Sequence, residues 1–316
     1  MSTTTPAPTV RGHRRAAVLG HPVAHSLSPV LHAAAYRALG LDDWAYERHD
    51  VTEDALPGFL AGLDPAWAGL SLTMPLKQVV IDLLDHVEPL AQAVGAVNTV
   101  LFSTVRGRVV RTGTNTDVHG IVAALRESLG TRRVADAVVL GGGATAASAL
   151  AALAELGCPS ARVFVRSPDR IGPLREAVGR MGVSPSFEVF DERATTSALA
   201  VADAVVSTTP KYASDVWAKL LTDGAARTAP ARAGAAEGEA AGERGVAPRG
   251  VLLDVVYDPR PTALQSAWTA LGAPAVGGER MLLHQAAEQV RLMTGHVAPI
   301  AAMDEALRLA LAAPAA

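Results

Sequence analysis

Polar side chains of several types stand at three points where a predicted strand runs into a predicted helix. They are Ser26 and Ser28, Thr73 and Lys77, and Asn115 and Asp117. Such strand ends gather at one edge of an open α/β sheet, where ligands bind, so we expect these side chains to lie close together. They would supply hydroxyl groups, an amide, an ammonium and a carboxylate. This set suits a small anion that carries several hydroxyl groups.

Each of these positions also has a purely structural interpretation. Ser28 stands before Pro29 at a helix start, where serine is a common N-cap and proline a common first residue. Asp117 can likewise be the N-cap of a helix over 118–129. Lys77 is different, because an ammonium in the first turn of a helix opposes the helix dipole. This unfavourable position suggests a chemical role for Lys77, with a solvated surface lysine as the alternative.

The middle of the chain contains a glycine turn between a strand and a helix. Gly141, Gly143 and Ala146 fit the pattern Gly-x-Gly-x-x-Ala. The apolar strand 138–140 precedes them, and the Ala- and Leu-rich helix 144–156 follows. Such a turn offers backbone N–H groups and a helix N-terminus to a phosphate group. The motif therefore indicates a dinucleotide site, and the alternative is an ordinary tight turn.

The end of the next strand, 161–165, bears on which dinucleotide would bind. An NAD-binding unit usually carries an acidic residue about 20 residues past the glycines. Here the strand is followed by Arg166 and Arg170, with no acid at its tip. Because a guanidinium can hold a 2′-phosphate, the sequence favours NADP over NAD. Two solvated arginines at a helix start are the alternative.

The composition fits a two-domain globular protein. The chain has 316 residues, of which 49% are hydrophobic and 19% charged, and its net charge is −3. The near-neutral charge gives no reason to expect nucleic acid or an anionic membrane as a partner. Cys158 is the only cysteine, which excludes an intrachain disulfide and a cysteine zinc site and fits the reducing cytoplasm. We expect no metal site, and no membrane span because no apolar run reaches about 18 residues.

The remaining elements frame these motifs. We expect strands over 16–19, 46–51, 69–73, 98–102, 109–112, 187–190, 202–210 and 251–257, and helices over 29–39, 52–63, 76–84, 277–293 and 300–311. Thr52 is expected to cap its helix. Residues 225–250 have almost no large apolar side chain, so we expect a flexible loop there, and a flexible tail over 1–12. The alternation predicts the α/β class, with an open α/β sheet before the glycine turn and a Rossmann-like unit after it.

Taken in order, these motifs resemble those of the shikimate dehydrogenase family over about residues 13–295. The segments that carry the resemblance are 25–29, 70–77, 95–99, 115–117, 141–145, 207–210, 254–257 and 281–285. Each segment alone is a weak signal, whereas the ordered set is specific.

The resemblance implies a role for each matching residue. The catalytic pair would be Lys77 and Asp117. The substrate-binding residues would be Ser26, Ser28, Thr73, Asn98, Asp117, Tyr257 and Gln285, with the two serines and Tyr257 at the carboxylate. The cofactor-binding residues would be Gly141, Gly142, Gly143, Ala144, Thr145, Arg166, Arg170, Thr208, Gly278 and Met281.

The resemblance also implies an activity and a domain plan. The activity would be the reversible, NADPH-dependent reduction of 3-dehydroshikimate to shikimate by a cytoplasmic monomer or homodimer. A substrate domain over 13–118 would be joined by returning C-terminal helices, 279–316. A Rossmann-like NADP domain would occupy 119–278. The implied partners are therefore small molecules.

Three departures from the family pattern accompany these implications. The family commonly has Asn where Ser71 stands, Asn-Arg-Thr at 165–167, and Gly-Ala-Gly-Gly-Ala at 141–145. One alternative is a broader quinate/shikimate dehydrogenase that uses NAD. A second is a non-catalytic NADP- or ligand-sensing protein on the same fold, and a third is a folate-linked dehydrogenase of similar architecture.

Overall fold

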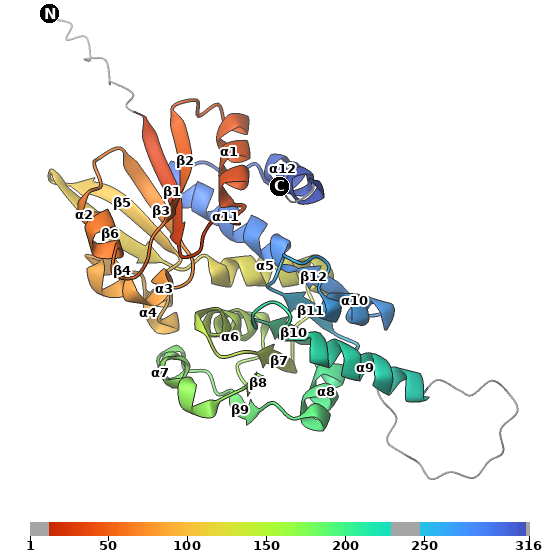
Figure 1. Cartoon of the computed structure of the whole chain (residues 1–316). Coiled ribbons are helices and arrows are strands. Elements are labelled where there is room, and N and C mark those ends of the chain that lie inside the picture. The colour runs from red at the N-terminus through yellow and green to blue at the C-terminus, as the bar shows by residue number, and fades with distance from the viewer. Residues whose placement is uncertain (1–12, 229–246, 314–316) are drawn as a thin grey trace, which may run out of the picture.

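The computed structural model describes residues 13–228 and 247–313, which form an α/β protein with two sheets of six strands each. Figure 1 shows the sheets in separate parts of the molecule, with helices α5 (Asp117–Leu129) and α11 (Gly278–Thr294) between them. The predicted α/β class and the two open sheets are confirmed. Among the described residues, no helix is both long enough and apolar enough to cross a membrane.

The first sheet has the strand order β2-β1-β3-β5-β6-β4. Its strands are β1 (Arg14–Gly20), β2 (Trp44–Asp50), β3 (Trp67–Leu72), β4 (His86–Val87), β5 (Thr99–Val105) and β6 (Arg108–Thr114). β3 runs parallel to β1 and antiparallel to β5, and β5 runs antiparallel to β6. The ends of β1, β3 and β6 and the start of β5 therefore share one edge. This confirms the predicted gathering of the three strand ends.

Short helices follow the strands of this sheet. They are α1 (Ser28–Ala38), α2 (Leu56–Ala61), α3 (Leu76–Val79), the 3₁₀ turn η1 (Ile81–Leu83) and α4 (Pro89–Val94). Leu19, Leu70 and Val100 of the sheet pack with Leu56 and Leu76 in one core. The sheet thereby holds α3, and with it Lys77, at the edge.

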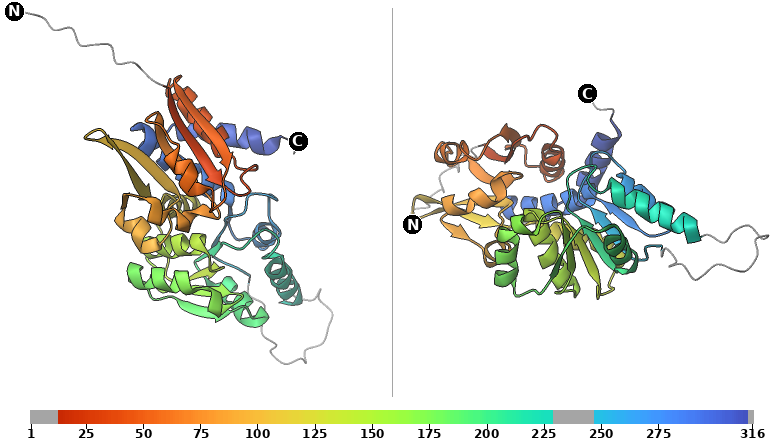
Figure 2. Two further views of the ribbon diagram at one scale, coloured as in Figure 1. Left: turned by 60° about the vertical axis from the view of Figure 1, so that its left-hand side comes forward. Right: turned by 60° about the horizontal axis from the view of Figure 1, so that its bottom comes forward.

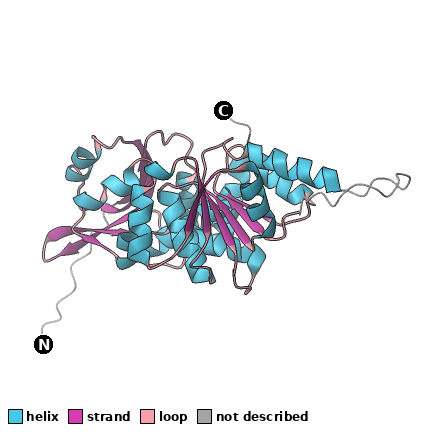
Figure 3. Cartoon of the chain, turned by 90° about the horizontal axis from the view of Figure 1, so that it is seen from below, coloured by secondary structure: helices cyan, strands magenta, loops and turns pink. Residues whose placement is uncertain are grey.

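The second sheet is entirely parallel, in the order β12-β11-β10-β7-β8-β9. Its strands are β7 (Ala137–Leu140), β8 (Arg162–Val165), β9 (Ser186–Val189), β10 (Ala204–Ser207), β11 (Val251–Asp254) and β12 (Ala275–Gly277). The other helices are α6 (Ala144–Leu156), η2 (Pro168–Arg170), α7 (Gly172–Met181), α8 (Glu192–Val201), α9 (Asp215–Thr228) and α10 (Ala263–Ala270). Figure 3 shows helices on both faces of this sheet.

The alternation of side chains along β7 explains this two-faced burial. Val139 packs in one core with residues of α5 and α6. Val138 and Leu140 point the other way, into a core formed with α8, α9 and α10. A parallel sheet that is covered on both faces needs such continuously apolar strands.

The last two helices, α11 and α12 (Ile300–Ala312), return to the first sheet, as the resemblance implies. Leu31 and Tyr36 of α1 pack with Leu283 and Val290 of α11 and with Leu307 of α12. Figure 2 shows α12 beside α1 in two further views. The predicted limits of the two domains, 13–118 with 279–316 and 119–278, stay a proposal. It is supported by α5, which begins at 117 and packs mainly in the core of the second sheet.

Helices α5 and α11 cross in close contact at Gly120. A Cβ atom at this position would lie 2.8 Å from the carbonyl oxygen of Met281 and 2.9 Å from Cβ of Gln285. Only glycine allows this approach without a shift of the backbone. The crossing therefore sets how far Met281 and Gln285 of α11 stand from Asp117 at the start of α5.

Several predicted element limits are wrong. The helix predicted over 52–63 is only α2, because Pro57 lacks the N–H that would bond to the carbonyl of residue 53. Thr52 caps no helix, and Ala55 is the N-cap. The helix predicted over 76–84 breaks into α3 and η1. The strand predicted over 251–257 ends at Asp254.

Two predicted N-caps are also wrong. Leu27 is the N-cap of α1, so Ser28 lies inside the first turn. Thr116 is the N-cap of α5, so Asp117 is its first residue. Both side chains are therefore left for other contacts. The predicted tail 1–12 lies outside the described residues, as does most of the predicted loop 225–250, although α9 continues to Thr228.

Candidate active site

A cavity of about 260 Å³ lies at the edge where the strands of the first sheet end. It is lined by all the residues predicted to bind substrate or to act in catalysis, namely Ser26, Ser28, Thr73, Lys77, Asn98, Asp117, Tyr257 and Gln285. Thr145, Gly278 and Met281, which were predicted to bind the cofactor, line it too. The cavity therefore joins the two predicted sites.

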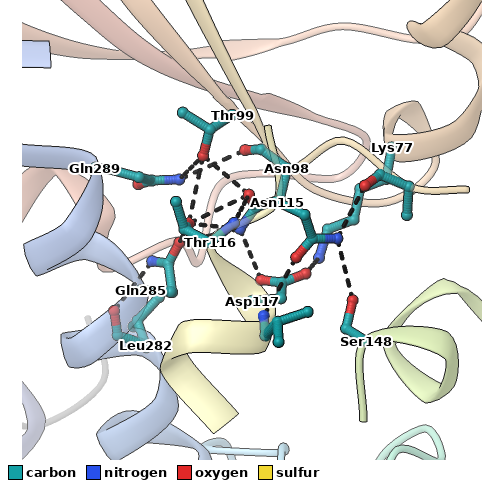
Figure 4. Close-up of polar contacts among 12 residues, drawn as sticks. Lys77, Asn98, Thr99, Asn115, Thr116, Asp117, Ser148, Leu282, Gln285 and Gln289 are labelled. Carbon is teal, nitrogen blue, oxygen red and sulfur yellow. Dashed lines mark hydrogen bonds and ion pairs between the residues drawn. The ribbon is translucent and has the colours of Figure 1, made fainter. Parts of the chain in front are cut away.

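Lys77 and Asp117 form an ion pair at the cavity wall. The Lys77 Nζ atom lies 2.6 Å from Asp117 Oδ2, and their side chains are only 16% and 6% exposed. Asn98 Nδ2 donates to the other carboxylate oxygen, Oδ1, at 2.8 Å. Figure 4 shows the three side chains converging. Both neighbours are donors, and a carboxylate has the two acceptor atoms that this arrangement requires.

The backbone fixes Lys77 opposite Asn98. α3 begins after Pro75, and the carbonyl oxygen of Lys77 accepts a hydrogen bond of 2.8 Å from the N–H of Val97. Asn98 Oδ1 accepts from the backbone N–H of Thr116 at 2.7 Å, which leaves its Nδ2 atom facing Asp117. The amide of Asn98 thus has one orientation that satisfies both contacts.

The lining of the cavity also carries hydroxyl groups. Ser26, Ser28 and Tyr257 line it, and burial raises the pKa of the Tyr257 phenol, so that it stays a hydrogen-bond donor. Ser26 Oγ accepts from the N–H of Ser28 at 3.3 Å, and Arg48 Nη2 donates to the carbonyl oxygen of Ser26 at 2.6 Å. Such donors near a guanidinium suit a carboxylate.

One residue of the predicted set lies elsewhere. The Asn115 side chain is buried and donates to the carbonyl oxygen of Ala96 at 2.8 Å and to Ser148 Oγ at 3.2 Å. It therefore holds α5 to its surroundings rather than facing this cavity. The amide that lies in the cavity wall with the hydroxyl groups, the ammonium and the carboxylate is that of Asn98, not that of Asn115.

Two cavity residues were missed at the sequence level. Ser71 was noted only as a departure from the family pattern, and Gln289 was not singled out at all, yet both line the cavity. Gln289 lies one helical turn beyond Gln285, which itself lies one turn beyond Met281. That spacing puts the three residues on one face of α11 and could have revealed Gln289.

The glycine turn has the geometry that a phosphate site needs. Gly141 has φ = +109°, and a Cβ atom there would lie 2.6 Å from Thr208 Oγ1. A Cβ atom at Gly143 would meet no described atom within 4 Å, so the turn is open in front of the N-terminus of α6. α6 has no acidic residue in its first turn, which leaves its N–H groups and positive dipole end available to an anion.

A second cavity, of about 140 Å³, lies beside this turn. Gly142, Gly143, Ala144 and Arg170 line it. Arg166 is exposed at the end of β8, and Thr208 bonds through Oγ1 to the carbonyl oxygen of Leu140 at 2.9 Å. Gly141, Arg166 and Thr208 are absent from the described linings of both cavities. The residues present fit a phosphorylated cofactor, and the individual contacts stay predictions.

Behind the first cavity, His32 is fully buried between α1 and β2. Its ring stacks on Tyr46 with centroids 3.9 Å apart, and its Nε2 atom lies 3.4 Å from Gln289 Oε1. Burial lowers the pKa of His32 to about 3. The ring is therefore neutral at physiological pH.

This buried histidine predicts an acid-sensitive stability. Between about pH 6.5 and 3 the unfolded chain binds a proton at His32 that the folded chain does not, so each pH unit of acidification should cost about 1.4 kcal/mol of unfolding free energy. We expect His32→Gln to show a smaller loss than the parent protein in urea titrations between about pH 7 and pH 5. Replacement of the exposed His296 is the control, and equal slopes for all three proteins would contradict the assignment.

Comparisons with known proteins agree with this geometry. Two family profiles match, "Shikimate dehydrogenase substrate binding domain" over residues 18–100 and "Shikimate 5'-dehydrogenase C-terminal domain" over 278–308. The chain is 37% identical to a shikimate dehydrogenase (NADP(+)) of Thermus thermophilus, over 94% of this chain and 98% of that protein. It is 35% identical to the protein of the same name from Geobacter sp. strain M21, over 97% and 99%.

Solved structures give the same result. The shikimate dehydrogenase of Mycobacterium tuberculosis superposes with a TM-score of 0.76 at 37% identity, over 94% of this chain and 99% of that one. The Thermus thermophilus enzyme, solved in complex with NADP(H) and shikimate, superposes with a TM-score of 0.71 at 34% identity, over 94% and 99%. The chain therefore belongs to the shikimate dehydrogenase family.

Proposed function

We propose that this chain catalyses the reversible, NADP-dependent oxidation of shikimate to 3-dehydroshikimate, with Lys77 and Asp117 as its catalytic pair. The observation that carries the proposal is the 2.6 Å Lys77–Asp117 ion pair in the wall of a cavity whose lining also bears hydroxyl groups. The glycine turn stands next to this cavity through Thr145. Substrate and cofactor sites thus adjoin.

The proton chemistry belongs to the chain's own residues. In the direction of reduction, the ketone oxygen gains negative charge and needs a proton, which the Lys77 ammonium donates from Nζ. In the direction of oxidation, Lys77 Nζ as the neutral amine takes the proton of the reacting hydroxyl group and becomes the ammonium. Asp117 holds Nζ in place, and Asn98 holds Asp117. When bound, NADP(H) accepts or supplies the hydride that the substrate carbon exchanges.

The other lining residues would orient the substrate. Ser26, Ser28 and Tyr257 would donate hydrogen bonds to its carboxylate, and Thr73 and Gln285 would contact its ring hydroxyl groups. A site that pairs with hydroxyl groups rejects analogues that lack them, because its own buried polar groups are then left unpaired. Gly141 to Thr145 would hold the pyrophosphate, with Gly278 and Met281 beside the cofactor.

One assay tests the activity. The purified protein is given shikimate or quinate with NADP or NAD, and formation of the reduced cofactor is followed by absorbance. We expect the highest kcat/KM for shikimate with NADP. A higher value for quinate with NAD would favour the broader quinate/shikimate dehydrogenase. Absence of turnover with every pair would favour a non-catalytic binding protein.

The cofactor preference is expected to depend on Arg170 more than on Arg166, because Arg170 lines the cavity beside the glycine turn. Loss of a charge-assisted hydrogen bond to a 2′-phosphate should raise the KM for NADP about 10- to 100-fold in Arg170→Ser. The KM for NAD should stay near its parent value. Arg37 is exposed on α1 and lines neither cavity, so Arg37→Ser is the matched control. Equal changes for NADP and NAD would exclude a 2′-phosphate contact.

A further inference from the structure

We propose that Gln289 is a positioning residue that links Ser71 to Asn98 in the wall of the cavity and sets the hydrogen-bonding direction of Ser71. The inference rests on the proposed function and concerns a residue outside the predicted site. Gln289 is fully buried on α11, and its side-chain amide reaches groups on β3 and β5 of the first sheet. Figure 4 shows it facing Thr99 and Asn98.

A continuous chain of hydrogen bonds passes through Gln289. On one side Tyr46 Oη donates to Ser71 Oγ at 2.6 Å, and Ser71 Oγ donates to Gln289 Oε1 at 2.8 Å. On the other side Gln289 Nε2 donates to Thr99 Oγ1 at 2.8 Å, and Thr99 Oγ1 donates to Asn98 Oδ1 at 2.9 Å. The chain therefore runs in one direction, from the phenol of Tyr46 to the amide that holds Asp117.

The direction of the chain is fixed by a group that can only accept. Gln289 Nε2 also lies 3.5 Å from the backbone carbonyl oxygen of Asn98, and an amide rotated by 180° would set two oxygen atoms against each other there. With the amide in this orientation, Nε2 of the neutral His32 ring is the donor to Gln289 Oε1 at 3.4 Å. Gln289 must therefore present its oxygen to Ser71 and its nitrogen to Thr99.

This arrangement makes Ser71 chemically different from Ser26 and Ser28. A serine hydroxyl has one proton and two acceptor lone pairs. The proton of Ser71 is given to Gln289, and one lone pair receives the proton of Tyr46. What remains for a ligand in the cavity is an acceptor, so Ser71 can bind a hydroxyl group of the substrate but cannot donate to its carboxylate.

The hydrogen-bond chain has two branches: a substrate branch from Tyr46 through Ser71 to Gln289, and a catalytic branch from Gln289 through Thr99 to Asn98. The catalytic branch acts on the Lys77–Asp117 pair. Thr99 and the N–H of Thr116 both donate to Asn98 Oδ1, which leaves the Nδ2 atom of Asn98 for Asp117. Without Gln289, Thr99 loses the donor that directs its own proton toward Asn98. The amide of Asn98, and with it the Lys77–Asp117 pair, would then be held less firmly.

Three variants separate the two branches. Ser71→Ala cuts the substrate branch and should raise the KM for shikimate about tenfold with kcat nearly unchanged. Thr99→Val keeps the shape but cuts the catalytic branch, and should lower kcat about tenfold with little change in KM. Gln289→Met cuts both, and should change both constants, with kcat/KM falling about 100-fold. The pH dependence of kcat should shift in Thr99→Val and Gln289→Met but not in Ser71→Ala.

The control is Gln265→Met, which removes a buried glutamine of α10 that caps its own helix in the second half of the molecule. It should lower the unfolding free energy without changing either kinetic constant. If Gln289→Met behaves like Gln265→Met, or like Ser71→Ala alone, Gln289 is not a positioning residue. If Gln289→Met does not fold, identical kinetics of Ser71→Ala and Thr99→Val would overturn the inference. Turnover of shikimate by the parent protein in the same assay keeps this outcome separate from failure of the proposed function.

Discussion

Replacement of Lys77 by methionine should lower kcat for shikimate oxidation by about 10²–10⁴-fold, which is the usual contribution of a positioned general acid or base. Methionine has a similar length, so the buried stem of the side chain keeps its packing while the proton carrier is lost. The proposed cofactor site lies around the glycine turn, so the dissociation constant for NADP should stay near its parent value. Steady-state kinetics and a fluorescence titration with NADPH measure the two quantities.

The exposed Lys219 on α9 offers a matched control for this variant. Lys219→Met removes the same charge from the same kind of side chain without touching the cavity. It should retain full activity. Turnover of Lys77→Met within a factor of about ten of the parent would remove Lys77 from the mechanism.

Replacement of Asp117 by asparagine should be almost as damaging, although the two side chains have nearly the same shape. Asp117 accepts from Lys77 Nζ through one oxygen and from Asn98 Nδ2 through the other. An asparagine has only one acceptor oxygen, so in either orientation its NH₂ group faces a donor. Because this unmatched contact is buried, we expect kcat to fall by about 10²-fold or more.

The carboxylate of Asp203 provides the comparison for this change. Its Oδ2 atom accepts from the backbone N–H groups of Ala135 and Asp136 at 3.0 Å each, on the second sheet. Asp203→Asn should lower thermal stability and leave kcat intact. The assignment of Asp117 fails if Asp117→Asn loses stability to a similar extent yet keeps its turnover.

The predictable part of the fold came from short segments with strong local signals. The three apolar residues before the glycines predict a buried strand, and the Ala-rich run after them predicts a helix. Residues 144–156 form α6 with the predicted limits. Polar residues directly after apolar strands, such as Ser26, Thr73 and Lys77, could be placed together because parallel strands end at a common edge.

The misplaced helix limits have a local cause that the apolar spacing did not reveal. Residues 76–84 have helical spacing, but the chain must turn back toward β4, and α3 ends after four residues. For Ser28 and Asp117 the N-cap was only the structural alternative to a site role; neither residue is an N-cap, and both line the cavity. Functional positions are where local preference and tertiary contacts disagree.

Spacing could have placed Gln289 on the same face of α11 as Met281 and Gln285, but its contacts were beyond sequence reasoning. A glutamine on a helix is ordinarily a solvent-facing residue. Its burial becomes visible only when α11 is laid on the first sheet, where Ser71, Thr99 and His32 satisfy its amide. Those partners lie some 190 to 257 positions away in the sequence, which no local pattern connects.

The return of α11 and α12 to the first sheet also bears on how the protein is made. About 160 residues separate the end of β6 from the start of α11, which is roughly 10–30 s of synthesis on the ribosome. During that time the apolar face of α1, with Leu31 and Tyr36, has no cover from α11 and α12. That apolar face is therefore exposed on the nascent chain throughout this interval, and the part of the cavity lining that α11 supplies is added only when residues 278–294 have emerged.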